Sequence, residues 1–314
     1  MTLAEAIATY VDLKQSMGMR FRSEHAILKA LHRQVGEVEL ADVTTDAVAA
    51  FLAGRGPITA TWLNKHRALR CFYHHWITRG RILGSPVPTV VPRVAQNFVP
   101  HVYSNDELRR LLAAVDAHQA RPGCQISADT FRVLLLLLYG AGLRISEALT
   151  LTREDVDVHA GLLLIRESKF YKSRQLPLGP TLVCHLVAYA DGARRRRARA
   201  PAMPFFATTR ETHISTAMAR LTFAGLRQRA GVQGRPGALN APRLHDLRHS
   251  FAVNRLVAWY REGADVQRLL PQLSTYLGHR RITSTQRYLT MIPELSEQAS
   301  LRFETYMRSE ARDA

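Results

Sequence analysis

A proline-rich segment divides the chain into a shorter first part and a longer second part. Three prolines fall within residues 85–92. Each proline lacks a backbone donor and biases the residue before it away from helix, so the segment predicts a stiff, extended linker. The 314 residues leave room for a hydrophobic core on each side. We therefore expect a first domain over residues 1–85, a linker over 86–100 and a second domain over 101–314.

The first part of the chain has the apolar periodicity of helices. Four stretches show it, over residues 3–13, 21–35, 46–52 and 58–78. Thr44 or Thr45 can cap the third stretch, and Gly54 and Gly56 can end it. The first domain is therefore expected to be a small helical unit.

The second part combines helical patterns with two short strands. Ser104, followed by Glu107, is typical of a capping box that starts a helix over residues 105–117. Residues 161–166 and 175–178 have the pattern of two strands around a polar turn. Further helices are expected over residues 131–140 and 145–151, near residues 181, 213 and 244, and from about 293 to the end. The sequence thus predicts a mainly α fold with a small β-sheet.

The charge of the chain points to a polyanionic partner. Lys and Arg total 43 against 26 Asp and Glu, a formal charge of +17. A positive excess of this size is most often found in proteins that bind nucleic acid. We expect double-stranded DNA as the partner. Candidate phosphate contacts are Lys65, Arg67 and Arg70 on one helix, Lys172 in the strand turn, and the run Arg194, Arg195, Arg196 and Arg197.

Other function classes find little support in the sequence. The apolar run over residues 133–139 is too short to cross a bilayer, and the first residues lack the profile of a secretory signal. The cysteines Cys71, Cys124 and Cys184 are far apart, which favours neither a disulfide framework nor a metal knuckle. We expect a cytoplasmic protein without membrane contact, resident metal or other cofactor.

Four separated segments carry residues suited to chemistry on a phosphodiester. They are Gly-Leu-Arg-Ile-Ser-Glu at 142–147, Lys169 with Lys172 in the strand turn, His-Asp-Leu-Arg-His-Ser-Phe-Ala at 245–252, and Leu-Gly-His at 277–279 followed by Tyr288. Together they supply two guanidinium groups, a lysine, histidines and a phenol. Phosphoryl transfer mainly needs in-line placement and neutralised oxygens, which arginine forks can provide without a metal.

Each of these groups can be given a role. Arg144 and Arg248 would grip the non-bridging oxygens, and Tyr288 would be the nucleophile. A free tyrosine is only about one part in a thousand phenolate at neutral pH, so Tyr288 needs help from His245 or the two arginines. Lys169, in preference to Lys172, would protonate the departing sugar oxygen.

The ordered segments resemble the tyrosine recombinase/integrase family. The resemblance implies that Arg144, Lys169, His245, Arg248, His279 and Tyr288 are catalytic and that Glu147 is a supporting acid. It also implies a helical, SAM-like core-binding domain followed by an α+β catalytic domain. Members of this family cut DNA through a 3′-phosphotyrosyl link and exchange strands in a tetramer, with no metal or nucleotide. The lysine turn departs from the family pattern because it lacks the usual glycines, and Leu289-Thr290 replaces the common Thr-His.

The resemblance implies a site-specific DNA recombinase or integrase, which we expect to serve a mobile element. Two alternatives stay open at this stage. The same scaffold could bind DNA without cutting it, since phosphate contacts need only the basic groups. Alternatively, His245 and His249 could hold a zinc ion, with Asp246 as the base of a hydrolase.

Overall fold

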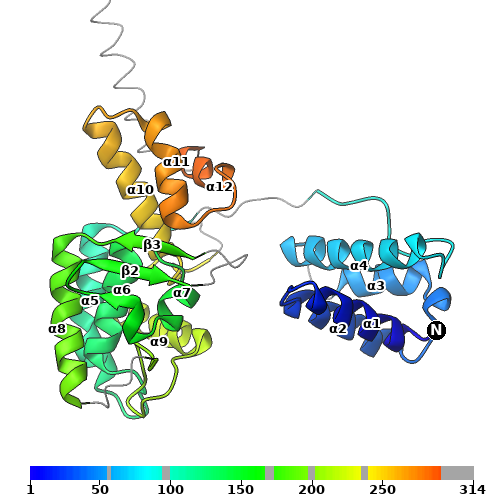
Figure 1. Ribbon diagram of the computed structural model, residues 1–314, viewed down its shortest axis with the longest axis horizontal. Coiled ribbons are helices and arrows are strands. Elements are labelled where there is room, and N and C mark those ends of the chain that lie inside the picture. The colour runs from blue at the N-terminus through cyan, green and yellow to red at the C-terminus, as the bar shows by residue number, and fades with distance from the viewer. Residues whose placement is uncertain (55–57, 94–99, 167–172, 197–201, 235–239, 291–314) are drawn as a thin grey trace, which may run out of the picture. The chain divides into compact units, whose positions relative to one another are not determined.

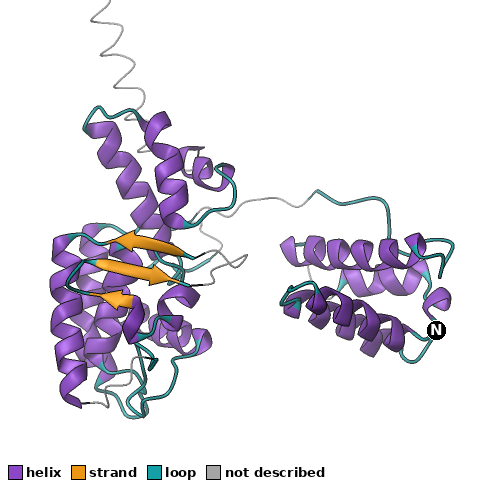
Figure 2. Ribbon diagram, in the orientation of Figure 1, coloured by secondary structure: helices purple, strands orange, loops and turns teal. Residues whose placement is uncertain are grey.

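A computed structural model describes the chain except for residues 55–57, 94–99, 167–172, 197–201, 235–239 and 291–314. The chain divides into two compact units, Met1–Asn97 and Phe98–Ala314. Figure 1 and Figure 2 show that the first unit is built of helices and that the second adds one small sheet. The expected fold class, mainly α with a small β-sheet, is confirmed.

Four α-helices build the first unit. They are α1 (Leu3–Ser16), α2 (Arg22–Val35), α3 (Thr45–Ala53) and α4 (Ala60–Thr78), with a 3-10 turn, η1 (Leu40–Asp42), between α2 and α3. The Thr44 side chain accepts from the Ala47 backbone at the start of α3, and Gly54 ends the helix, as the sequence predicts. Phe72 and Tyr73 of α4 are fully buried. The aromatic face of α4 therefore belongs to the core.

The proline-rich segment packs against α4 at its start. Val87 is buried in the first core, and the carbonyl of Pro88 lies 2.8 Å from Nε2 of the buried His66. Residues 85–92 contain no helix or strand, as their prolines predict. The first unit therefore extends past residue 85.

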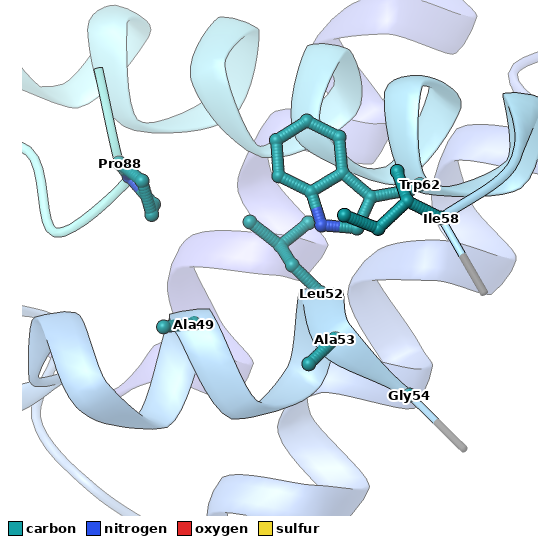
Figure 3. Close-up of a pocket in the computed structure, with 7 residues that line it drawn as sticks. All are labelled: Ala49, Leu52, Ala53, Gly54, Ile58, Trp62 and Pro88. Carbon is teal, nitrogen blue, oxygen red and sulfur yellow. The ribbon is translucent and has the colours of Figure 1, made fainter. Parts of the chain in front are cut away.

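An apolar groove lies between α3 and α4 in the first unit (Figure 3). It is lined by Ala49, Leu52, Ala53, Gly54, Ile58, Trp62 and Pro88. None of these residues has an ionisable side chain, so the groove itself supplies no acid, base or nucleophile.

The second unit packs helices around a three-stranded antiparallel sheet. The helices before α10 are α5 (Asn105–Gln119), α6 (Ala128–Gly140), α7 (Ile145–Thr150), α8 (Pro180–Arg196) and α9 (Thr216–Arg229), with a 3-10 turn, η2 (Arg153–Asp155). The strands are β1 (Val156–Asp157), β2 (Leu162–Ile165) and β3 (Arg174–Pro177), in the order β1-β2-β3. Ile165 pairs with Arg174, so these two residues face each other where the lysine turn leaves the sheet.

Three helices at one end of the second unit share a small core of their own. They are α10 (Asp246–Arg261), α11 (Val266–Leu277) and α12 (Thr283–Thr290), shown in gold to orange in Figure 1. Leu256, Leu273 and Tyr288 are buried together in this core. The sequence predicts a helix near residue 244 but none over α11 or α12. The helix expected from 293 onward lies outside the described residues.

No helix in the described part of the chain is both long enough and apolar enough to span a membrane.

Candidate active site

Gly142 forms the turn that leads the chain from α6 to Arg144. Its φ of +60° is in the left-handed region, and a Cβ there would lie 2.4 Å from Cδ1 of Phe251. Glycine is therefore the residue that fits. Arg144 follows as the N-cap of α7, where its backbone N–H donates to Oε2 of Glu147 at 3.0 Å. Its Nη1 also donates to Oε1 of the same carboxylate at 2.6 Å.

Arg248 lies on the first turns of α10 and is 2% exposed. Its Nη1 donates to the carbonyl of Gly142 at 2.7 Å, and its Nη2 donates to that of Leu277 at 2.6 Å. Burial and then the charge of Arg144 lower the pKa of Arg248 to about 10. The guanidinium therefore remains a cation at neutral pH.

The end of α11 anchors three arginines through successive carbonyls. Nε of Arg174 donates to Tyr276 at 3.1 Å, Nη2 of Arg248 to Leu277, and Nη2 of Arg144 to Gly278 at 2.7 Å. The last carbonyls of a helix lack intrahelical partners and carry partial negative charge. The C-terminus of α11 therefore holds the arginines close together against their mutual repulsion.

Glu147 is the buried anion at the centre of this cluster. Its carboxylate accepts hydrogen bonds from Arg144 and Arg174 and lies 3.8 Å from Nη1 of Arg248. Burial raises the pKa of Glu147, but the hydrogen bonds and charges of Arg174 and then Arg144 outweigh it, and the pKa is lowered. Glu147 is therefore ionised and balances part of the cationic charge.

Tyr288 of α12 contacts two histidines, and a third lies against one of them. Its hydroxyl lies 2.9 Å from Nδ1 of His249, and its ring stacks on His279 at 6.3 Å between centroids. Nδ1 of His279 is itself 2.7 Å from Oγ1 of Thr285. The ring of His245 contacts that of His249 edge to face at 4.8 Å. Burial raises the pKa of Tyr288, and the charges of Arg248 and Arg144 oppose this only in part.

The three histidines share a lowered pKa. Loss of water around each ring is the largest cause, and nearby cationic groups add to it. The pKa falls to about 4 for His245, where Arg248 contributes next, and to about 3 for His249 and His279. All three imidazoles are therefore neutral at pH 7.

Comparison with known proteins assigns the sequence of the chain to a family. Residues 102–293 match the phage integrase family. The protein y4rB of Sinorhizobium fredii, which is named as an integrase/recombinase, is 33% identical over 310 residues that cover 96% of this chain and 97% of that protein. The chain belongs to the phage integrase family of tyrosine recombinases.

Other members of the family are similar over much of the chain. The tyrosine recombinase XerD of Mycobacterium tuberculosis is 32% identical over 252 residues, covering 79% of this chain and 72% of its own. The Tn1549 transposon integrase bound to a circular intermediate DNA has a TM-score of 0.69 at 14% identity, covering 96% of this chain and 99% of that chain. A lambda integrase tetramer bound to a Holliday junction has a TM-score of 0.66 at 19% identity, covering 90% of this chain and 79% of that chain. The structural likenesses support the fold.

The structure of this tyrosine recombinase brings most of the residues expected from the sequence into one cluster. Those brought together are Arg144, Glu147, His245, Arg248, His279 and Tyr288. Lys169 and Lys172 lie outside the described residues. The roles of all eight residues stay predictions.

Two further residues of the cluster were not assigned to the phosphodiester site from the sequence. Arg174 contacts Glu147 and α11, and His249 contacts Tyr288. The sequence contained a signal for His249, because His245 and His249 are four residues apart and share a helix face. Arg174 lies one residue before the expected strand 175–178, and no spacing connects it with Glu147.

The residues expected to contact DNA have different surroundings. Arg67 and Arg70 are exposed on α4. Nζ of Lys65 instead donates to the carbonyl of Phe51 at 2.9 Å and lies 4.2 Å from the centroid of its ring, so this lysine packs against α3. The last three residues of α8 are Arg194, Arg195 and Arg196, and Arg197 lies outside the described residues.

The zinc alternative gains nothing from the structure. In the described part of the chain, no three His, Cys, Asp or Glu side chains cluster as metal ligands would. The expected base, Asp246, accepts from the backbone and side chain of Arg243 at 2.8 and 2.9 Å. Asp246 is thus held by an ion pair and a hydrogen bond to Arg243.

Proposed function

We propose that this tyrosine recombinase cleaves and rejoins DNA at specific sites through a 3′-phosphotyrosyl intermediate with Tyr288 as the nucleophile. The observation that carries the proposal is the position of the Tyr288 hydroxyl, 2.9 Å from His249 and beside the buried Arg248 of the same chain. A phenol, a histidine and guanidinium groups in one cluster suit attack on a phosphodiester.

Arg144 and Arg248 would bind the non-bridging oxygens of the scissile phosphate. Each uses both terminal nitrogens on protein acceptors in the DNA-free chain. A guanidinium has five N–H donors, so each arginine can hold its protein acceptor and still donate to an oxygen. Because Arg248 and Tyr288 are buried, the groups that cover them must move apart to admit the phosphate.

The cleavage step would then proceed as an in-line displacement. Oη of Tyr288 forms a bond to phosphorus, and the bond from phosphorus to the 5′ oxygen of the next nucleotide breaks. That oxygen must leave with a proton, which we assign to Lys169, with Lys172 as the alternative donor. The ester to tyrosine preserves the energy of the broken bond, so the 5′ hydroxyl can later reverse the step without ATP.

The partner of this reaction would be double-stranded DNA, and the working assembly a tetramer of this chain or of related chains. The net charge of +17 supports the first statement. The lambda integrase tetramer bound to a Holliday junction supports the second, as a protein of the same fold. Relatives named as integrases, including that of the Tn1549 transposon, support a role in moving a mobile element.

The proposal is tested by trapping the covalent intermediate. Wild type and Tyr288→Phe are incubated in EDTA with nicked duplexes that tile the DNA flanking the gene, and denaturant-resistant adducts are resolved on gels. We expect adducts with the wild type alone. A Tyr288→Phe variant that still cleaves would overturn the assignment of the nucleophile. Sequence-specific binding without any adduct from either protein would favour the DNA-binding protein that does not cut.

A further inference from the structure

The contact between His249 and Tyr288 concerns the proton that the nucleophile must lose. The sequence suggested His245 or the arginines for this task. In the structure, Nδ1 of His249 is 2.9 Å from the Tyr288 hydroxyl, with the two rings inclined at 61°. His249 lies on α10, four residues after His245, which is the N-cap of this helix.

The direction of this hydrogen bond follows from burial. Tyr288 is 5% exposed, and its raised pKa keeps it a phenol at neutral pH. A buried O–H needs an acceptor, and among the described residues the hydrogen-bond partner of this hydroxyl is Nδ1 of His249. The neutral imidazole can accept there if its own proton is on Nε2. The phenol therefore donates to His249.

The other groups around Tyr288 are less suited to accept its proton. Arg144 and Arg248 carry only donors. Nδ1 of His279 is hydrogen-bonded to Thr285, and the His279 ring stacks on Tyr288 at 27° between planes, rather than pointing a nitrogen at the hydroxyl. His245 meets the His249 ring edge to face. His249 is the histidine in hydrogen-bonding contact with the reacting oxygen.

We propose that His249 is a catalytic residue whose Nδ1 takes the phenolic proton as Oη of Tyr288 bonds to phosphorus. The O–H bond of Tyr288 breaks and an N–H bond forms on His249, while the 5′ oxygen leaves with its proton from the general acid. In the rejoining step, His249 returns the proton to Tyr288 as the tyrosine leaves phosphorus. This inference rests on the proposed function and adds the fate of one proton.

The surroundings of His249 would make it a stronger base when DNA is bound. Burial lowers its pKa first, the neighbouring His245 lowers it next, and the positive charges of Arg243 and Arg248 lower it further. A phosphate oxygen on Arg248 would bring negative charge that opposes these cations and raises the pKa of the imidazole. His249 would therefore gain basicity when the substrate occupies the site.

The test is the pH dependence of adduct formation by His249→Asn, in which an amide oxygen can replace Nδ1 as an acceptor but not as a base. On the trapping substrate, we expect DNA affinity within about twofold of wild type and adduct formation slower by about 10²–10⁴-fold. Without a base, the rate should rise about tenfold per pH unit as phenolate forms, whereas the wild type should level off. A profile of wild-type shape in His249→Asn would overturn the proposal.

His245→Asn is the matched control on the same helix face. If His245→Asn acquires the steep pH profile and His249→Asn does not, His245 is the base and the inference is wrong. The same gels separate this failure from failure of the proposed function. In the first case the wild type still forms adducts that Tyr288→Phe does not, and in the second the wild type forms none.

A measurement on the unaltered ring keeps the inference testable if His249→Asn does not fold. In the DNA-free wild type, ¹⁵N spectra of the histidine rings should show His249 with its proton on Nε2, and its Nδ1 resonance should shift in Tyr288→Phe. A proton on Nδ1 would reverse the hydrogen bond and overturn the proposal.

Discussion

Arg174 and Glu147 form an ion pair with two parallel hydrogen bonds. Nη1 of Arg174 lies 3.1 Å from Oε1 of Glu147, and Nη2 lies 3.0 Å from Oε2. The same carboxylate accepts from Arg144. Arg174 is the first residue of β3 and also holds the carbonyl of Tyr276 at the end of α11. One side chain therefore connects the sheet, the buried carboxylate of Glu147 and the helix end that anchors the arginines.

Loss of Arg174 should impair chemistry more than DNA binding. In Arg174→Ala, Glu147 loses two hydrogen bonds and can turn away from Arg144, so we expect adduct formation to slow by about 10- to 100-fold. Arg174→Lys keeps the charge but not the paired hydrogen bonds, so its rate of adduct formation should lie between those of the wild type and Arg174→Ala. Single-turnover adduct assays and gel-shift affinities at the same pH measure the two effects separately.

Arg166→Ala is the control for Arg174→Ala on the same hairpin. Arg166 forms an ion pair with the buried Asp155, away from Glu147. Its loss should lower the free energy of unfolding without slowing the chemical step. Equal slowing in both variants would show that the effect of Arg174 comes from general weakening of the hairpin.

Gly278→Ala should displace Arg174. Gly278 has a φ of +66°, and a Cβ there would lie 2.7 Å from Nη1 of Arg174. The matched control is Gly263→Ala, with a φ of +72° and no heavy atom within 4 Å of the added carbon. Both should lose about 1–2 kcal/mol of stability from backbone strain, measured by urea unfolding. Only Gly278→Ala should lose adduct formation as well, and equal activity in the two variants would contradict the role of this contact.

The free energy of unfolding should decrease as the pH is lowered from 7 toward 4. His249 and His279, with a pKa of about 3 each, stay neutral in the fold while their unfolded counterparts gain protons below about 6.5. The unfolded chain then binds more protons, so each such histidine contributes a slope of up to about 1.4 kcal/mol per pH unit. Urea titrations from pH 7.5 to 5 test this, and His249→Asn should flatten the slope. An equal slope in wild type and variant would indicate that His249 keeps its ordinary pKa.

Lys169→Ala should slow cleavage by about 10²–10⁴-fold if this lysine is the general acid. A substrate with sulfur in place of the 5′ bridging oxygen has a leaving group that needs no proton and should restore much of the rate. Lys172→Ala is the control in the same turn and should show neither the large loss nor the rescue. Rescue of Lys172→Ala instead would assign the acid to Lys172.

Local sequence signals predicted much of the fold. The capping box of Ser104 and Glu107 starts α5 at Asn105 as expected, because both partners lie within one turn. The helix α11 was not predicted, because its short apolar pattern is interrupted by Pro271. A proline inside a helix removes one hydrogen bond, and here the packing of Leu270 and Leu273 in the small core offsets that loss.

The residue types of the candidate active site were predictable from the sequence, but their contacts were not. The spacing of Arg144 and Glu147 along the chain places them on one helical turn, so their ion pair is a local property. Arg174 at the start of β3 reaches Glu147 of α7 from a distant part of the sequence, and His249 meets Tyr288 because α12 packs against α10. Such long-range contacts depend on packing that one sequence without its fold does not reveal.

Locating the residue to which DNA becomes attached tests the role of Tyr288 as the nucleophile. Wild-type adducts are digested with nuclease and trypsin, and the DNA-linked peptide is identified by mass spectrometry. We predict a nucleotide joined through its 3′ phosphate to Tyr288, in the tryptic peptide that runs from Tyr288 to Arg302. A nucleotide attached to any other residue would contradict Tyr288 as the nucleophile.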